Sequence, residues 1–363
     1  MIIAHTGDLH IKDGGIVTLD EQTAVLRQIR RDVDVIVVSG DIFDGASTPA
    51  ERNAALETFQ FWGEEAPVIA VKGNHDRDGD LLYLSELRTK NLIHVAEAFE
   101  ILRTPECVFV LIPWPSRAKV AAWMTEADRT SVDAAAGGAM RALLSGARAM
   151  TTDSAAPVVV VGHLEIGSAT MDSGQPIAGR CDIEVGADDL AEVDANYYAL
   201  GHIHKPQDVA ASMRYAGSPR QMSHGEAPGH GYTIAKVGRG GCQVKHVELK
   251  SPRFYTVEAV WHDGKLRIEY GAADPRADFL KLRYTVPEAD RTQAREAAEK
   301  WAAAWEHCKL DPVIITEERA SRSEVRAARS PEEKLTALWE AKGAAPGRSK
   351  EILEKLTVLS VVC

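Results

Sequence analysis

Five short clusters of aspartate, asparagine and histidine, each placed directly after an apolar run, constrain this chain more than any other feature. In chain order they are Asp8-Leu9-His10, Gly40-Asp41-Ile42-Phe43-Asp44, Gly73-Asn74-His75-Asp76, Gly162-His163 and Gly201-His202-Ile203-His204. Side chains at the carboxyl ends of neighbouring strands converge on one edge of a sheet, where sites in α/β folds are usually built. The sequence therefore predicts that the five clusters meet at one site.

Short β-rich runs alternate with amphipathic helical stretches over the first two-thirds of the chain. We expect strands at residues 2–5, 33–39, 67–72, 107–112, 157–162, 197–200 and 214–216, and helices at 20–31, 49–64, 80–90 and 133–150. Such alternation predicts an α/β domain whose helices cover a layered sheet.

The pattern changes near Ser251-Pro252. Residues 253–261, 279–286 and 312–316 are expected to be strands, and 288–308 a helix with one apolar face. Residues 332–342 and 349–359 predict two short helices, whose apolar seam must dock on the body or on another protein because it cannot be buried by the pair alone. We therefore expect a large domain at 1–250, a small α+β domain at 251–320 and a short helical tail at 321–363.

Composition limits the class of protein. Hydrophobic residues make up 45% and charged residues 26%, a balance typical of soluble globular chains. No apolar run approaches the roughly 18–20 residues that span a bilayer, and the N-terminus lacks the basic start of a secretion signal. Five dispersed cysteines indicate free thiols in a reducing compartment. We therefore expect a cytoplasmic protein.

The net charge bears on nucleic-acid binding. It is −11 at pH 7, and affinity for nucleic acid comes largely from neutralising phosphates, so the balance counts against tight autonomous DNA binding. It is compatible with a nuclease whose bound cations supply local positive charge, or whose partner holds the DNA.

The clusters offer carboxylates, an amide oxygen and imidazoles, which suit first-row divalent cations. Cysteine is absent from all five, which argues against a structural zinc site. Taken singly, each cluster has an ordinary explanation, since Gly-Asp can be a plain turn and His163 a half-buried histidine. Their joint occurrence at strand ends favours one shared metal site.

The set Asp-x-His, Gly-Asp-x-x-Asp, Gly-Asn-His-Asp, Gly-His and Gly-His-x-His, over about residues 1–235, resembles the signature of calcineurin-like metallophosphoesterases. The resemblance implies a layered β-sandwich flanked by helices. It also implies that one metal is held by Asp8, His10, Asp41 and His204 and a second by Asp41, Asn74, His163 and His202, with Asp41 bridging. The resemblance suggests Mn²⁺, and the ligands alone also admit Mg²⁺, Fe²⁺ or Zn²⁺.

The same resemblance implies catalytic roles. Water activated by the metals attacks phosphorus, and His75 protonates the leaving oxygen or stabilises the transition state. Asp76 either orients His75 or is a solvated loop acid. Asp44 stands where related nucleases carry histidine, and it either contributes to the site or only forms hydrogen bonds. Arg77 and Lys205, next to the metal motifs, are candidates for phosphate contact.

Within the family, the chain is similar to SbcD-type DNA-repair nuclease subunits. His5-Thr6-Gly7-Asp8-Leu9-His10 resembles their opening strand, and Tyr215-Ala216-Gly217-Ser218-Pro219, followed by Glu226 and an expected strand at 231–237, resembles their closing segment. The resemblance implies that 251–320 is a capping domain and that the tail docks on an SbcC-like, SMC-type ATPase. It also implies a homodimer, formed through 49–64 or 80–90 unless the apolar stripes of those helices are core.

Three functions follow from these observations. The leading one is a metal-dependent DNA exonuclease and endonuclease that acts at DNA ends in repair or recombination, together with the ATPase. The alternatives are a phosphodiesterase on small nucleotides or phosphoesters, and a non-catalytic subunit that regulates the ATPase.

Overall fold

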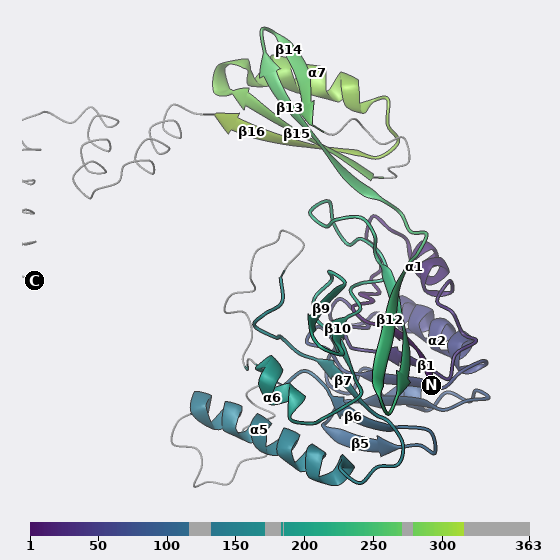
Figure 1. The fold of residues 1–363 in the computed structure, drawn as a ribbon. Helices are drawn as coiled ribbons and strands as arrows, with labels where there is room; N and C mark the ends of the chain where they lie inside the picture. The colour runs from purple at the N-terminus through teal and green to yellow at the C-terminus, as the bar shows by residue number, and fades with distance from the viewer. Residues whose placement is uncertain (116–131, 171–182, 184, 271–278, 316–363) are drawn as a thin grey trace, which may run out of the picture. The chain divides into compact units, whose positions relative to one another are not determined.

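The chain divides into two units, Met1–Arg253 and Phe254–Cys363 (Figure 1). The described residues of each unit form an apolar core of their own. The computed structural model describes residues 1–115, 132–170, 183, 185–270 and 279–315. The expected tail helices at 332–342 and 349–359 lie outside the described residues.

The first sheet of the first unit carries three of the five clusters. Its order is β12-β11-β1-β2-β3-β4. The strands are β1 (Ile2–Thr6), β2 (Val35–Val38), β3 (Val68–Val71), β4 (Ile93–Ala96), β11 (Gly231–Gly238) and β12 (Gly241–Glu248). Strands β1 to β4 are parallel, whereas β11 and β12 are antiparallel to their neighbours. Because β1, β2 and β3 are adjacent and parallel, the clusters that follow them lie at one edge.

The second sheet carries the two remaining clusters. Its order is β5-β6-β7-β8-β10-β9. The strands are β5 (Glu100–Arg103), β6 (Val108–Ile112), β7 (Val158–His163), β8 (Tyr197–Gly201), β9 (Gln207–Ala210) and β10 (Met213–Tyr215). Strands β6, β7, β8 and β10 are parallel, and β5 and β9 are antiparallel edges. His163 is the last residue of β7, and His202 directly follows β8.

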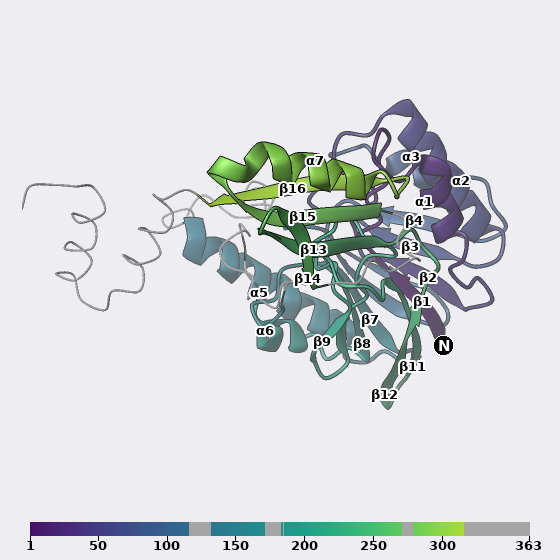
Figure 2. The same ribbon diagram turned by 90° about the horizontal axis from the view of Figure 1, so that it is seen from above.

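The two sheets share an apolar core, and helices cover their outer faces. In β1, Ile3 packs with Phe109 and Val159 of the second sheet, whereas Ala4 belongs to the core that includes Phe59 and Trp62. Helices α1 (Leu19–Leu26), α2 (Pro49–Gly63) and α3 (Leu82–Ser85) lie on one side, and α5 (Val132–Thr151) and α6 (Ala187–Ala191) on the other (Figure 2). The predicted α/β class, with layered sheets flanked by helices, is confirmed for this unit.

Local signals explain where two of these helices begin. Thr18 and Glu21 form a capping box at the start of α1, and Thr48 and Glu51 form one at the start of α2, where Pro49 occupies the first turn. The apolar stripe of α2 is core, since Ala55, Phe59 and Trp62 are fully buried within the chain.

The second unit has one sheet of order β14-β13-β15-β16. Its elements are β13 (Phe254–His262), β14 (Lys265–Tyr270), β15 (Phe279–Pro287), the 3-10 turn η2 (Glu288–Asp290), α7 (Arg291–Ala302) and β16 (Cys308–Ile315). Ala294 and Ala298 of α7 are buried against Leu282 and Tyr284 of the sheet. No helix in the described part of the chain is both long and apolar enough to cross a bilayer.

Three predicted helices are shorter than expected, and the one expected at 20–31 already ends at Leu26. The helix expected at 80–90 ends at Ser85, because the chain turns back to enter β4 and the Ser85 hydroxyl accepts the Val95 N–H at 3.0 Å. The helix expected at 288–308 ends at Ala302, and Cys308 instead begins β16, where it pairs with Leu280.

Phe59 provides a test of the core between α2 and the first sheet. Its side chain is fully buried, so Phe59→Ala is expected to destabilise the protein by about 3–5 kcal/mol. Phe61→Ala on the same helix is the matched control, because the Phe61 ring is only partly buried and lies under the Arg31 guanidinium. Its loss should cost about 1 kcal/mol. Urea unfolding followed by circular dichroism measures both, and equal effects would contradict the packing.

Candidate metal centre

The Asp41 carboxylate lies at the centre of the five clusters. It is 2% exposed, and its Oδ1 accepts the backbone N–H of His75 at 2.9 Å. Its Oδ2 lies 3.6 Å from Nε2 of His10 and 3.4 Å from Nε2 of His163. One carboxylate oxygen is therefore close to imidazoles from both sheets, the position that a bridging ligand would need.

Asp8, His10 and His204 form one group next to Asp41. One ligand atom from each lies within 4.8 Å of the others, and Nε2 of His10 is 3.1 Å from Nε2 of His204. Asp8 is fully buried, and its carboxylate accepts the backbone N–H of His202 at 3.0 Å. Strands β1 and β8 are thus joined at their carboxyl ends by the side chain of a predicted ligand.

Asn74, His163 and His202 form a second group. The Asn74 Oδ1 accepts hydrogen bonds from Nε2 of His163 at 2.8 Å and from Nδ1 of His202 at 3.0 Å. We call the seven predicted ligands together the ligand cluster: Asp8, His10, Asp41, Asn74, His163, His202 and His204. The structure brings all seven together, with buried carboxylates as the floor and the exposed Asn74 at the rim.

Backbone strain is concentrated in the ligand cluster. Seven non-glycine residues have positive φ in the described part of the chain, and four of them are Asp8 (50°), His10 (42°), Asp41 (49°) and His202 (108°). Such conformations cost of the order of 1–3 kcal/mol each and persist where the surroundings impose them, often at functional sites. The four strained residues are themselves members of the ligand cluster.

Two glycines leave room for the cluster. Gly40 has a φ of 97°, and a Cβ there would lie 2.3 Å from Nδ1 of His163. A Cβ on Gly73 would lie 2.0 Å from the Asp41 carboxylate. Any side chain at either position would displace a predicted ligand.

The donor atoms fit a pair of divalent cations. Nδ1 of His10 donates to Asp44 at 3.1 Å, and Nδ1 of His204 donates to Glu226 at 3.0 Å. With Nδ1 protonated, a neutral ring presents a lone pair at Nε2, and the two Nε2 atoms face each other at 3.1 Å. A shared proton or a cation relieves that repulsion, and imidazole with carboxylate is a set that first-row divalent metals bind.

The electrostatics agree with this fit. Burial lowers the pKa of His163, but the carboxylates of Asp41 and Asp8 outweigh burial and raise it to about 9. Burial and the neighbouring His163 lower the pKa of His202 to about 3, which keeps that ring neutral. A fully buried imidazole with a raised pKa reports a negative potential, and the same potential attracts a metal cation.

A comparison with models of protein families shows which family the chain belongs to. The model of the calcineurin-like phosphoesterases matches residues 1–206, the part of the chain that contains the whole ligand cluster. This chain belongs to the calcineurin-like phosphoesterase family. The predicted resemblance is confirmed at that level.

Relatives of this phosphoesterase include three bacterial proteins, each described as the D subunit of the nuclease SbcCD. The protein from Staphylococcus epidermidis is 26% identical over 65% of this chain and 66% of its own length. The protein from Bacillus subtilis is 29% identical over 62% of this chain and 63% of its own length. The protein from Rhodobacter capsulatus is 28% identical over 69% of this chain and 70% of its own length. The chain thus spans just under two thirds of the length of the first two.

A solved structure of a protein of unknown function from Aquifex aeolicus matches 45% of this chain and 80% of its own. It is 12% identical, with a TM-score of 0.24, a similarity too low to support any conclusion.

The structure gives Asp76 a different place from the one expected. Its buried carboxylate accepts backbone N–H groups from Phe43 at 2.8 Å, Gly73 at 2.9 Å and Ile42 at 3.2 Å. It is therefore neither a solvated loop acid nor, among the described contacts, a partner of the His75 ring. Burial and the nearby Asp41 raise the pKa of Asp76 to about 6. Asp76 ties the turn after β2 to the turn after β3, which positions Asp41.

Two carboxylates outside the ligand cluster orient its histidines. Asp44 binds the His10 ring through Oδ1 and the Lys12 ammonium through Oδ2, at 2.5 Å. Glu226 binds the His204 ring and also accepts the N–H of Met222 at 2.6 Å. Carboxylates that fix metal-binding imidazoles in this way raise their basicity. The structure thus gives Asp44 a hydrogen bond that orients the His10 ring, in line with one of the two roles expected for it from the sequence.

His75 is exposed at the rim, beside the His10 ring at 4.9 Å between centroids. Its Nδ1 donates to the backbone carbonyl of Asp44 at 3.2 Å, which leaves Nε2 on the far side of the ring. Arg77 is exposed and Lys205 is partly exposed. In the described part of the chain, neither makes a hydrogen bond or ion pair with the ligand cluster.

Sequence reasoning missed two side chains beside the cluster. Glu165 is buried with Oε2 3.7 Å from Nε2 of His202, and its signal is its position two residues after His163. Trp114 lies against His202 with 4.8 Å between ring centroids, and its signal is an aromatic residue just beyond the carboxyl end of β6.

The orienting role of Asp44 can be tested by metal titration. Asp44→Ala removes the partner of the His10 Nδ1, so affinity for Mn²⁺ should fall about 10–100-fold. Asp32→Ala is the control, because Asp32 is exposed and pairs only with Arg30 among the described contacts. Isothermal titration calorimetry measures both, and an unchanged affinity in Asp44→Ala would refute the orienting role.

Proposed function

We propose that this chain is a metal-dependent DNA nuclease subunit that hydrolyses phosphodiester bonds at DNA ends, as exonuclease and endonuclease. The observation that supports it most strongly is the Asp41 oxygen placed between the His10 and His163 imidazoles. A carboxylate shared in this way suits a two-cation centre, and such centres act on phosphate esters by in-line displacement.

The ligand cluster would hold two divalent cations, Mn²⁺ in our proposal, with Asp8, His10, Asp41 and His204 on one side and Asp41, Asn74, His163 and His202 on the other. When bound, the cations supply an activated water and neutralise charge on the phosphoryl oxygens. The buried carboxylates keep the floor of the site negative in their absence. The exposed rim at Asn74 and His75 leaves the scissile phosphate a way in.

The chain's own residues then handle the proton. The Asp44 carbonyl holds the His75 ring by Nδ1, so Nε2 faces away from that carbonyl and is free to donate a proton to the leaving oxygen. The backbone N–H of His75 is fixed on the Asp41 carboxylate, which ties the acid to the metal centre. We assign phosphate contacts outside the centre to Arg77 and Lys205.

DNA as substrate, and an SbcC-like ATPase as partner, rest on the relatives described as the D subunit of the nuclease SbcCD. The net charge of −11 supports a division of labour in which a partner holds the DNA. We propose that residues 251–320 act as a capping domain and that 321–363 dock on the ATPase. Homodimerisation completes the assembly in this proposal.

The substrate class is tested with end-labelled linear duplex DNA and bis-(p-nitrophenyl) phosphate, under Mn²⁺, with and without an SbcC-like ATPase. We expect cleavage of both substrates. Turnover of the small ester alone, even with the ATPase present, would favour a phosphodiesterase of small nucleotides. Turnover of neither would favour a regulatory subunit.

His75 is tested in the same assays. His75→Ala should lower the cleavage rate about 100-fold or more, because it removes the general acid, while Mn²⁺ content stays unchanged. His262→Ala is the control, since His262 is exposed in the second unit. Loss of bound Mn²⁺ in His75→Ala would contradict the assigned role.

A further inference from the structure

Trp114 places a large aromatic surface at the edge of the ligand cluster. It follows β6 by two residues and is partly exposed. Its ring lies 4.8 Å from the His202 ring, at an interplanar angle of 37°, and 5.8 Å from the His163 ring, edge-on. The indole is therefore next to the Asn74 side of the centre.

The backbone holds Trp114 rigidly. Pro113 and Pro115 flank it, and each fixes its own φ and restricts the residue before it. The backbone N–H of Trp114 donates to the Lys72 carbonyl at 2.9 Å, which joins the end of β6 to the segment that leads into Asn74. A rigid aromatic side chain loses little conformational entropy when a flat ligand stacks on it.

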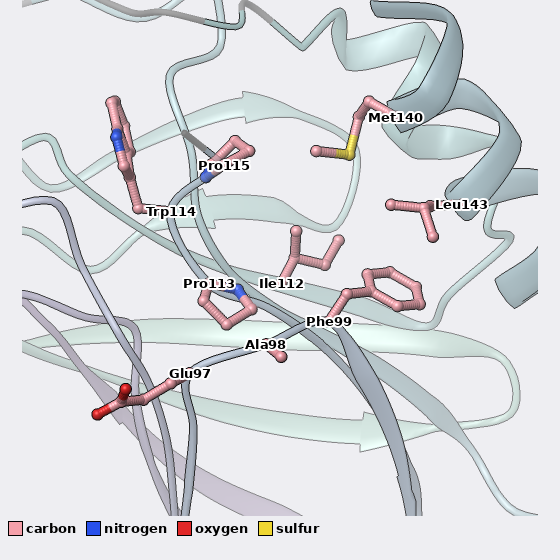
Figure 3. A pocket seen from close by; sticks show the side chains of 9 residues that line it. All are labelled: Glu97, Ala98, Phe99, Ile112, Pro113, Trp114, Pro115, Met140 and Leu143. Atoms are coloured by element: carbon pink, nitrogen blue, oxygen red, sulfur yellow. The ribbon is translucent and has the colours of Figure 1, made fainter. Parts of the chain in front are cut away.

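The residues around Trp114 form an apolar niche. Ile112, Phe99, Met140 and Leu143 line a pocket, with Trp114 at one end and Met140 and Leu143 at the other (Figure 3). Glu97 is the one carboxylate in this lining. Ile112 and Met140 are buried, so the parts of this lining that a ligand can reach include the partly exposed Trp114 and Phe99 rings.

We propose that Trp114 stacks on the base of the nucleotide next to the scissile phosphate. This inference rests on the proposed function, because it needs a nucleic-acid substrate. A base is one sugar away from its phosphate, and every base has a π-face, so stacking on tryptophan is tolerant of sequence. A chain of net charge −11 gains little from phosphate attraction. Base stacking supplies substrate affinity that does not depend on charge.

The competing role for Trp114 is to shield the His202 ring from water, without touching substrate. The two roles differ in one respect. A shield affects every phosphodiester equally, whereas a stacking platform matters only when the substrate carries a base.

The test uses a single-stranded oligonucleotide in which every linkage but one is a methylphosphonate, which offers the metals no anionic oxygen, so that cleavage occurs at one position. Two analogues replace the base on one or the other side of that linkage by a tetrahydrofuran abasic residue. Wild type, Trp114→Leu, Trp114→Phe and the surface control Phe61→Leu are compared under Mn²⁺, with kcat and KM measured separately.

For wild type, kcat/KM should fall about tenfold on one of the two abasic analogues, mainly through a higher KM. Trp114→Leu should show the same loss on the intact oligonucleotide and no further loss on that analogue. Trp114→Phe should retain most of the activity, and Phe61→Leu should match wild type.

Two outcomes would overturn the inference while leaving the proposed function intact. One is equal wild-type cleavage of the intact and both abasic oligonucleotides. The other is a Trp114→Leu loss of the same factor on all three, which would indicate shielding of His202. Failure of wild type to cleave the intact oligonucleotide, as well as duplex DNA, would instead refute the proposed function and the inference with it.

Discussion

The position of one carboxylate, that of Asp41, determines the rest of the site. The residue sits in a left-handed backbone conformation after β2, with its side chain buried between imidazoles from two sheets. Two sets of hydrogen bonds hold it there. The backbone N–H of His75 donates to the Asp41 carboxylate. The backbone N–H groups of Ile42 and Phe43 donate to the Asp76 carboxylate. The turns after β2 and β3 are thus hydrogen-bonded to each other, and a movement of either turn would displace Asp41.

The parallel strands bring the other ligands to the same place as these two turns. Strands β1, β2 and β3 deliver carboxylates and Asn74 from one sheet, and β7 and β8 deliver histidines from the other. The buried carboxylates of Asp8 and Asp41 lie close to the imidazoles of His10, His163 and His204. Asp44 accepts a hydrogen bond from Nδ1 of His10, and Glu226 accepts one from Nδ1 of His204, which orients both rings. Under the proposed function, the buried carboxylates attract the cations, and His75 and Trp114 lie where the substrate would bind.

Much of this followed from the sequence, for a physical reason. Inner strands such as β2 and β7 are buried on both faces and read as continuous apolar runs, so the clusters after them could be placed at one edge. The five strands that sequence reasoning missed, β4, β5, β9, β12 and β14, are all edge strands, where polar residues dilute the pattern. The structural role of Asp76 and the contact of Trp114 with His202 depend on tertiary packing, which residue spacing does not encode.

The most direct test of the shared carboxylate is a crystal of the protein soaked in Mn²⁺ and measured at the manganese absorption edge. The anomalous map should show two peaks bridged by Asp41, one next to His10 and His204 and the other next to Asn74 and His163. A single peak, or peaks that Asp41 does not contact, would contradict the two-cation centre.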